Sequence, residues 1–130
     1  MPRTVITTEG APRAIGSYSQ AIESNGTVFL SGQIPLDPTT MKLVEGNLDT
    51  QLCQVFENLQ NVAEAAGGTL GDVVKVTVYL TDLSEYPVVN EVMQRFFNAP
   101  FPARAVVGVA ELPMGARAEA DAILVLGSGN

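Results

Sequence analysis

Residues 48–68 read LDTQLCQVFENLQNVAEAAGG and residues 73–80 read VVKVTVYL, and these two stretches decide the fold. In the first, apolar side chains recur at spacings of three and four, which gives an α-helix one apolar face. Asn47 can cap the start of this helix, and Gly67-Gly68 supplies a left-handed stop. The second stretch is rich in β-branched residues, which favour a strand. The apolar positions of the predicted helix are Leu48, Leu52, Val55, Phe56, Leu59, Val62, Ala63 and Ala66.

The sequence before the helix predicts three strands. Asn25-Gly26 is a hairpin turn signal between the second and third of them. Ile34-Pro35 and Asp37-Pro38 then end the third strand and begin a polar loop. The predicted strands are Thr4–Thr7, a weaker candidate at Tyr18–Glu23, and Thr27–Gln33.

The sequence after residue 80 predicts a second helix and two more strands. Ser84 precedes the helix, which runs to about Phe97 and tolerates Pro87 in its first turn. The final strands are Ala103–Ala110 and Arg117–Leu126. The order β-β-β-α-β-α-β-β predicts an α+β fold in a single domain over residues 1–130, in which about six strands form a sheet and two helices pack on one face.

The second face of this sheet is expected to meet another subunit. In the strand at residues 73–80, alternation places Val74, Val76, Val78 and Leu80 in one row, with Val73 and Tyr79 opposite. Both faces of the strand are therefore partly apolar. Burial of the uncovered face against a partner explains this pattern, and homo-oligomerisation follows as a hypothesis.

Composition excludes several classes of function. The 14 acidic and 7 basic residues give a formal net charge of -7 without a basic run, so nucleic acid is a poor partner. No apolar run approaches the length of about 20 residues that spans a bilayer, and residues 1–17 lack the apolar core of a signal peptide. One cysteine, Cys53, suits a reducing compartment, and we expect a cytoplasmic protein.

The absence of histidine is the most informative count. It removes Ser-His and Cys-His dyads and, with a single cysteine, leaves no zinc site. No glycine-rich nucleotide fingerprint is present either. Proton transfer near neutral pH must then use a carboxyl, Tyr, Lys, the cysteine or water.

Strand parity selects the candidate residues for chemistry. It groups Arg104, Val106 and Gly108 on one face of their strand, and Glu119 with Asp121 on one face of the next. Arg104 presents a planar fork that fits a carboxylate, although an ion pair within the chain or a solvated arginine is equally compatible with the pattern. Glu119 is a candidate general base if burial raises its pKa, and otherwise an exposed strand glutamate.

Four further residues are weaker candidates. The hydroxyl of Tyr18 can orient a ligand, or its ring can pack in a strand. Ser31 and Gly32 can seat a ligand, or mark a β-bulge. Asn90 is either a pocket residue or an ordinary polar residue of the second helix, and none of these signals is specific alone.

In order along the chain, the motifs resemble the signature blocks of the RidA (YjgF-like) family of reactive intermediate deaminases. The resemblance runs from about Thr4 to Val125, and the block at residues 101–105 followed by an alanine-rich strand with Glu119 is its most telling part. The blocks are GSYSQA at 16–21, SGQIP at 31–35, AAG at 65–67, VKVTVYL at 74–80, VN at 89–90 and FPARA at 101–105.

The resemblance implies a chorismate-mutase-like fold assembled as a homotrimer, with sites between subunits. It implies hydrolysis of 2-imino acids and their enamine tautomers, such as 2-aminoacrylate and 2-aminocrotonate, to 2-oxo acids and ammonia without a metal or organic cofactor. Arg104 matches the arginine that holds the substrate carboxylate, and Glu119 matches the glutamate that activates water. Tyr18, Ser31, Gly32 and Asn90 match residues that line the pocket.

Two positions depart from the family pattern. Val106 stands where the family often has Cys, and we expect it to shape the pocket, since a mechanism based on water needs no thiol. Ser17 replaces the common Pro before Tyr18, which loosens that loop. Two other functions stay open: a trimer that binds 2-oxo acids or similar metabolites without turnover, and an endoribonuclease, which the charge and the missing histidine oppose.

Overall fold

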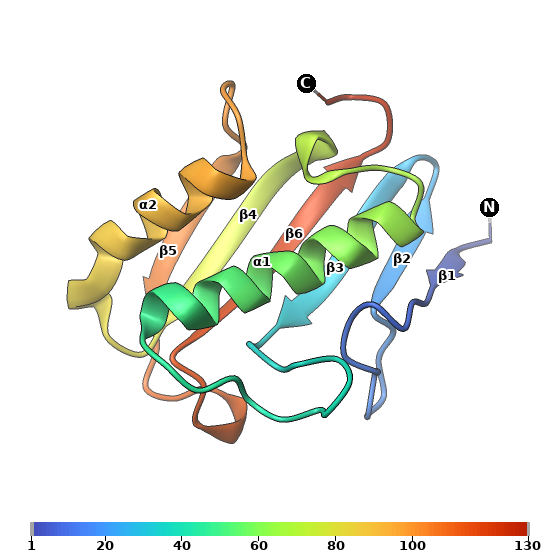
Figure 1. Ribbon diagram of the computed structural model, residues 1–130. Helices are drawn as coiled ribbons and strands as arrows, with labels where there is room; N and C mark the ends of the chain where they lie inside the picture. The colour runs from blue at the N-terminus through green and yellow to red at the C-terminus, as the bar shows by residue number, and fades with distance from the viewer. Residues whose placement is uncertain (1, 130) are drawn as a thin grey trace.

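The computed structural model describes residues 2–129, and its elements follow the predicted order (Figure 1). Three short 3-10 turns connect the longer elements at Leu70–Asp72, Leu83–Glu85 and Pro113–Gly115. The strands are β1 (Thr4–Ile6), β2 (Ala21–Ser24), β3 (Thr27–Gln33), β4 (Val73–Leu80), β5 (Ala103–Gly108) and β6 (Ala118–Val125), and the helices are α1 (Leu48–Ala65) and α2 (Tyr86–Phe96).

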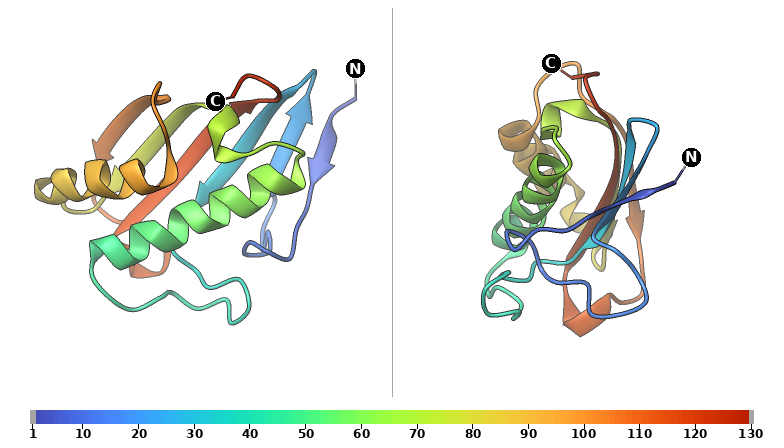
Figure 2. Two further views of the ribbon diagram at one scale, coloured as in Figure 1. Left: turned by 45° about the horizontal axis from the view of Figure 1, so that its top comes forward. Right: turned by 90° about the vertical axis from the view of Figure 1, so that its right-hand side faces the viewer.

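The six strands form one mixed sheet in the order β1-β2-β3-β6-β4-β5. The β4–β5 pair is parallel and the other pairs are antiparallel. Both helices lie on the same face of the sheet, as the edge-on view in Figure 2 shows, and the opposite face is uncovered. The prediction of an α+β fold with two helices on one face is confirmed.

Local sequence signals explain where the elements begin and end. Asn25 and Gly26 both have positive φ, as a two-residue hairpin turn between β2 and β3 requires. The Asn47 side chain accepts a hydrogen bond from the backbone N–H of Thr50 and caps α1, and Gly67 follows the helix with φ +94. Pro87 falls in the first turn of α2, as expected.

The core lies between the sheet and the two helices. The predicted apolar row of α1 is fully buried from Leu48 to Ala63, and Ala66 packs against it. From β6 the core receives Ala118, Ala120, Ala122 and Leu124, and the small side chains of the three alanines let α1 approach the sheet closely. The alternation predicted for this last strand is therefore confirmed.

Several predicted strand and helix boundaries differ from the structure. The weak strand expected at 18–23 begins only at Ala21, because residues 16–18 form bends. The second helix begins at Tyr86, since a 3-10 turn capped by the Asp82 side chain takes up Ser84. The last two strands are each two residues shorter than predicted and span Ala103–Gly108 and Ala118–Val125.

The predicted row in β4 was wrong at its start. Val73 is buried and Val74 is exposed, the reverse of the expected placement. The pairing of β4 with β6 shifts register between Val73 and Lys75, so alternation is interrupted there. From Val76 onward the row Val76, Val78 and Leu80 is buried as predicted.

Buried amides tie the long loops to this frame. The Gln20 side chain donates to the carbonyls of Thr8, Ala11 and Pro12 and accepts from the Thr8 N–H. The Asn58 amide donates to the Leu36 carbonyl at 3.0 Å. Because a buried amide without partners would destabilise the fold, these bonds fix the loops at residues 8–12 and 34–36. Neither described helix is long and apolar enough to cross a membrane.

Candidate active site

Arg104 projects from β5 toward α2, on the face of the sheet that the helices cover. Its register partner in β4 is the buried Val76, which places both side chains on that face. Its Nη1 donates to Asn90 Oδ1 at 2.7 Å, and its Nη2 donates to the hydroxyl of Tyr86 at 2.6 Å. The guanidinium carbon also lies 5.3 Å from the centroid of the Tyr86 ring. Two groups on successive turns of α2 thus hold both ends of the guanidinium.

The partners of Arg104 are uncharged. Besides the amide and the phenol, Nη1 lies 3.7 Å from the Met93 sulfur. Across residues 2–129 the one ion pair is between Arg95 and Asp49, so Arg104 is not paired to a carboxylate of its own chain. The alternative of an ion pair within the chain is therefore wrong, and a partly buried cation is held in place with its charge uncompensated.

Glu119 lies on the opposite face of the sheet. Its register partner in β4 is Tyr79, which faces away from the helices. The carboxyl sits directly above Gly32 in β3, where a Cβ would overlap Glu119 Oε2 and approach its carboxyl carbon to 3.0 Å. The β3–β6 register shifts between Leu30 and Gln33, which confirms the β-bulge predicted at Ser31-Gly32; a role in seating a ligand stays a prediction. The bulge brings a residue without a side chain under the carboxyl.

Burial raises the pKa of the Glu119 carboxyl, and the nearby charge of Asp121 raises it further. Asp121 accepts a hydrogen bond from the Tyr79 hydroxyl at 3.0 Å, which fixes its position on the same face. A carboxyl with a raised pKa holds and releases a proton closer to neutral pH than an exposed glutamate. The direction of this shift is the one that a general base requires, and that role of Glu119 stays a prediction.

Tyr18 and Ser31 lie on the side of Glu119. Tyr18 is 52% exposed, and its ring lines the same cavity as Glu119. It belongs to a loop, so the alternative of a strand aromatic is wrong. The Ser31 hydroxyl donates to the Ser19 carbonyl, which ties β3 to the Tyr18 loop. Ser31 thus supports the loop from which Tyr18 projects.

Val106 lies on the side of Arg104. It is in register with Val78 on the helix-covered face and packs, partly buried, against the core. Val106 belongs to the same strand as Arg104, and its two methyl groups fill space between β5 and the core. Val106 does not line the cavity that contains Arg104, so its expected role in shaping the pocket stays a prediction.

The predicted site residues thus form two groups, and one chain does not bring the groups together. Two cavities reflect this division, one of about 340 Å³ and one of about 320 Å³. The first contains Arg104 and Asn90, with Gln94, Phe101 and Pro102. The second contains Glu119 and Tyr18, and is otherwise walled mainly by apolar side chains, which include Ile15, Ile34 and Met114.

Sequence reasoning missed Tyr86 and Met93, the other partners of Arg104. A signal existed, since Tyr86 and Asn90 are four residues apart and share one face of a helix. That helix was expected to begin after Ser84, and nothing in the sequence showed which strand residue its polar face would meet. Strand alternation placed Arg104 on one face of its strand, but it could not show whether the helices cover that face of the sheet.

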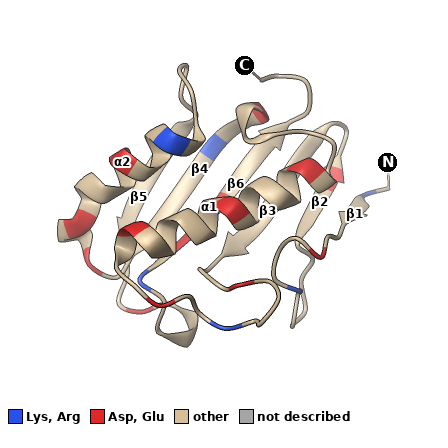
Figure 3. Cartoon of the chain, viewed as in Figure 1, with Lys and Arg blue, Asp and Glu red and all other residues tan. Residues whose placement is uncertain are grey.

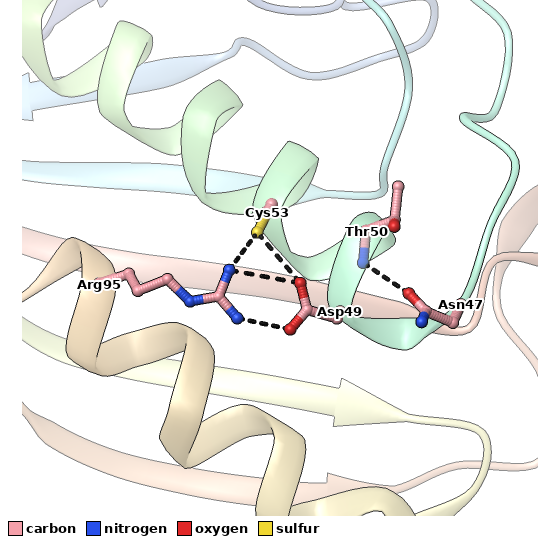
Figure 4. A network of polar contacts seen from close by, with 5 residues as sticks. All are labelled: Asn47, Asp49, Thr50, Cys53 and Arg95. Carbon is pink, nitrogen blue, oxygen red and sulfur yellow. Dashed lines mark hydrogen bonds and ion pairs between the residues drawn. The ribbon is translucent and has the colours of Figure 1, made fainter.

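Cys53 takes part in a separate network on the outer side of the helices (Figure 4). Arg95 Nη1 donates to its sulfur at 3.4 Å and to Asp49 Oδ1 at 3.3 Å, so the network joins α1 to α2. Burial raises the pKa of the thiol. Charged residues elsewhere are scattered over helices, strands and loops, and the basic ones do not gather into a patch (Figure 3).

The fold and the two polar groups define a class: small α+β proteins with a six-stranded mixed sheet, an unpaired arginine on one face and a half-buried glutamate on the other. Residues 8–126 match the family described as Endoribonuclease L-PSP. The chain belongs to this family, the RidA (YjgF-like) family that its motifs resemble.

Individual relatives agree over nearly the whole chain. The chain is 45% identical to a 2-iminobutanoate/2-iminopropanoate deaminase of Dermatophagoides farinae, covering 96% of this chain and 98% of that protein. A human protein of the same name is 42% identical, with 96% and 91% covered. The crystal structure of RidA from the Antarctic bacterium Psychrobacter sp. PAMC 21119 superposes with a TM-score of 0.91 at 50% identity, covering 95% of this chain and 99% of that one.

Proposed function

We propose that this protein hydrolyses reactive 2-imino acids and their enamine tautomers to 2-oxo acids and ammonia. The observation that carries the proposal is the uncompensated charge of Arg104, which uncharged groups hold in place on the wall of a cavity. Such a guanidinium is a receptor for a carboxylate, the group that every 2-imino acid carries. Two relatives that match nearly the whole chain are named as deaminases of 2-iminobutanoate and 2-iminopropanoate, which supports this substrate class.

The reaction needs a fixed substrate, a water and one group that transfers protons. In the imine form, the oxygen of water attacks the imine carbon and the C=N π electrons move to nitrogen. Glu119 accepts a proton from the water and passes it to the nitrogen, which leaves a neutral carbinolamine. The C–N bond then breaks as the C=O bond forms, and Glu119 transfers the hydroxyl proton to the departing nitrogen, which leaves as ammonia. Water is the only co-substrate, so the chemistry calls for no metal or organic cofactor.

The site is proposed to form between subunits of a homotrimer with a chorismate-mutase-like fold. Arg104 and Glu119 lie on opposite faces of one sheet, so a substrate that meets both must lie between two copies. The uncovered face also carries exposed apolar side chains, among them Val5, Phe29 and Val107. A partner that covers this face removes them from water and supplies the second half of the site.

The remaining residues are proposed to line the shared pocket. Asn90 belongs to the half with Arg104, and Val106 limits the size of the side chain accepted there. Tyr18, Ser31 and Gly32 belong to the half with Glu119. Most of the rate is expected from positioning and proton transfer, because the imine is already reactive.

A coupled assay tests the proposal. A pyridoxal-phosphate dehydratase generates 2-aminocrotonate or 2-aminoacrylate, and the appearance of the 2-oxo acid is followed with and without this protein. We expect faster appearance with the unaltered protein and with Arg95→Ala, a matched arginine variant on the outer side of α2. Arg104→Ala is expected to remove the acceleration.

The same assay separates the other two functions. A metabolite-binding protein without turnover would bind 2-oxobutanoate yet leave the rate unchanged. An RNA substrate is disfavoured by the net charge of -7, since phosphate groups would be repelled. No acceleration with either imine would end the deaminase proposal for those substrates.

A further inference from the structure

We propose that Tyr86 is a positioning residue that holds Arg104 in the orientation in which it binds the substrate carboxylate. The inference rests on the proposed function, because it assigns the carboxylate to Arg104. It adds a residue at the start of α2 that neither the motifs nor the family resemblance singled out.

Tyr86 is one of two side chains, with Asn90, that hold the Arg104 guanidinium in place by hydrogen bonds. Tyr86 and Asn90 are separated by one helical turn, and they bind Nη2 and Nη1 respectively. The Tyr86 ring also lies near the guanidinium, with 5.3 Å between the ring centroid and the Arg104 carbon. An unrestrained arginine loses considerable rotamer freedom on binding a ligand, so two anchors reduce that cost in advance.

The chemistry of the phenol matters as much as its position. The Tyr86 oxygen accepts the hydrogen bond from Arg104, so its own O–H remains able to donate to a second group. Both anchors are neutral and leave the positive charge of Arg104 for an anion. A carboxylate residue at position 86 would instead neutralise the cation and compete with the substrate.

Removal of the Tyr86 hydroxyl tests the contribution of its hydrogen bond with Arg104 to carboxylate binding. Tyr86→Phe keeps the ring beside the guanidinium and deletes only the hydrogen bond. Loss of a hydrogen bond to a charged group is expected to weaken carboxylate binding about tenfold. The KM for the imine is expected to rise by a similar factor while kcat changes by less than about twofold, since Glu119 and the water are untouched.

The test compares two ligands that differ in one group. Dissociation constants are measured by calorimetry for 2-oxobutanoate and for its primary amide, with the unaltered protein, Tyr86→Phe and Asp49→Asn. The Asp49→Asn control breaks the ion pair between α1 and α2 without touching Arg104. Tyr86→Phe is expected to weaken the carboxylate about tenfold and the amide by much less, and Asp49→Asn is expected to leave both unchanged.

Three results would overturn the inference: equal weakening of both ligands by Tyr86→Phe, unchanged binding of both, or no preference for the carboxylate in the unaltered protein. A failure of the proposed function looks different. In that case, 2-oxobutanoate binds in a manner that depends on Arg104 but imines are not turned over, and the effect of Tyr86→Phe is still measured by binding.

Discussion

At the scale of single residues, Gly32 is important to the proposed chemistry because it leaves room for the Glu119 carboxyl. The Glu119 carboxyl occupies the space that any side chain at position 32 would need. Nothing about φ at Gly32 demands glycine, so the requirement comes from this close approach alone. The position of the carboxyl is therefore coupled to a backbone bulge in the neighbouring strand.

Gly32→Ala is expected to push the Glu119 carboxyl away from its position and lower kcat about a hundredfold, because small displacements of a reacting group are costly. The cost in stability is expected to be small, because the atoms that a Cβ would meet belong to the end of the flexible Glu119 side chain, which can turn away. The matched control is Gly108→Ala, whose Cβ would meet Leu83 at an ordinary 3.5 Å. Steady-state kinetics on both variants, with circular dichroism to verify folding, makes the comparison; equal activity in the two would contradict the proposed role of Gly32.

The raised pKa of Glu119 predicts a shape for the pH profile. If Glu119 must be ionised to accept a proton from water, kcat/KM falls as pH drops through this raised pKa. Asp121→Asn removes a negative charge that favours the protonated form, so the pKa falls and the acid limb moves to lower pH. Profiles of kcat/KM for both proteins show the shift, and an acid limb that stays in place would remove Asp121 from this role.

The sequence predicted the members of the site better than their arrangement. Alternation along two strands selected Arg104 and Glu119, because charged residues in mid-strand stand out from apolar neighbours. It could not show that the two side chains lie on opposite faces of the sheet. Alternation groups the residues of one strand by face, but it does not say which face of the sheet each group occupies, and the strand order was not predicted. Tyr86 was missed for a related reason: the sequence does not show which residue of another element a side chain on a helix surface will contact.

At the scale of elements, α1 is the best specified part of the chain. Its apolar period, its cap and its glycine stop all agree, and its predicted start matches the observed one. Agreement between independent local signals is what makes an element predictable. At the start of β4, by contrast, the register shift between Val73 and Lys75 is set by pairing with β6, and no signal in the local sequence predicts it.

The cap of α1 offers a test of local stability. Asn47→Ala removes the acceptor of the Thr50 N–H and is expected to lower the free energy of unfolding by about 1 kcal/mol. Asn47→Asp keeps an acceptor and adds a charge that the helix N-terminus favours, so it is expected to be neutral or stabilising. Urea unfolding at one fixed protein concentration compares the three proteins. Equal loss in both variants would show that the cap contributes little.

At the scale of the whole molecule, the sheet separates the two halves of the proposed site. The strand register places Arg104 on one face of the sheet and Glu119 on the other. Both helices lie on one face, that of Arg104, and leave the other open (Figure 2). The sequence predicted an uncovered apolar face and hence a partner, on the grounds that both faces of β4 contain apolar residues. A site shared between copies gives that face a second role, since each interface would join the arginine of one subunit to the glutamate of the next.

Mixing two inactive variants tests this division directly. Arg104→Ala lacks the carboxylate anchor and Glu119→Gln lacks the proton acceptor, so each alone is expected to be inactive. After the two are unfolded and refolded together in equal amounts, an interface is active only when an intact Arg104 meets an intact Glu119. Half of the subunits supply each group, and random assembly is expected to restore about a quarter of the original activity.

The controls make the result specific to a shared site. Each variant refolded alone must stay inactive, and light scattering must show the same assembly for the mixture and the unaltered protein. Native mass spectrometry then confirms that mixed assemblies have formed, since the two variants differ in mass. If mixed assemblies are present and activity stays at the level of the separate variants, both groups must act within one chain. In that case the sheet would have to rearrange to bring Arg104 and Glu119 to one face, which the strand pairing on both sides of β4 opposes.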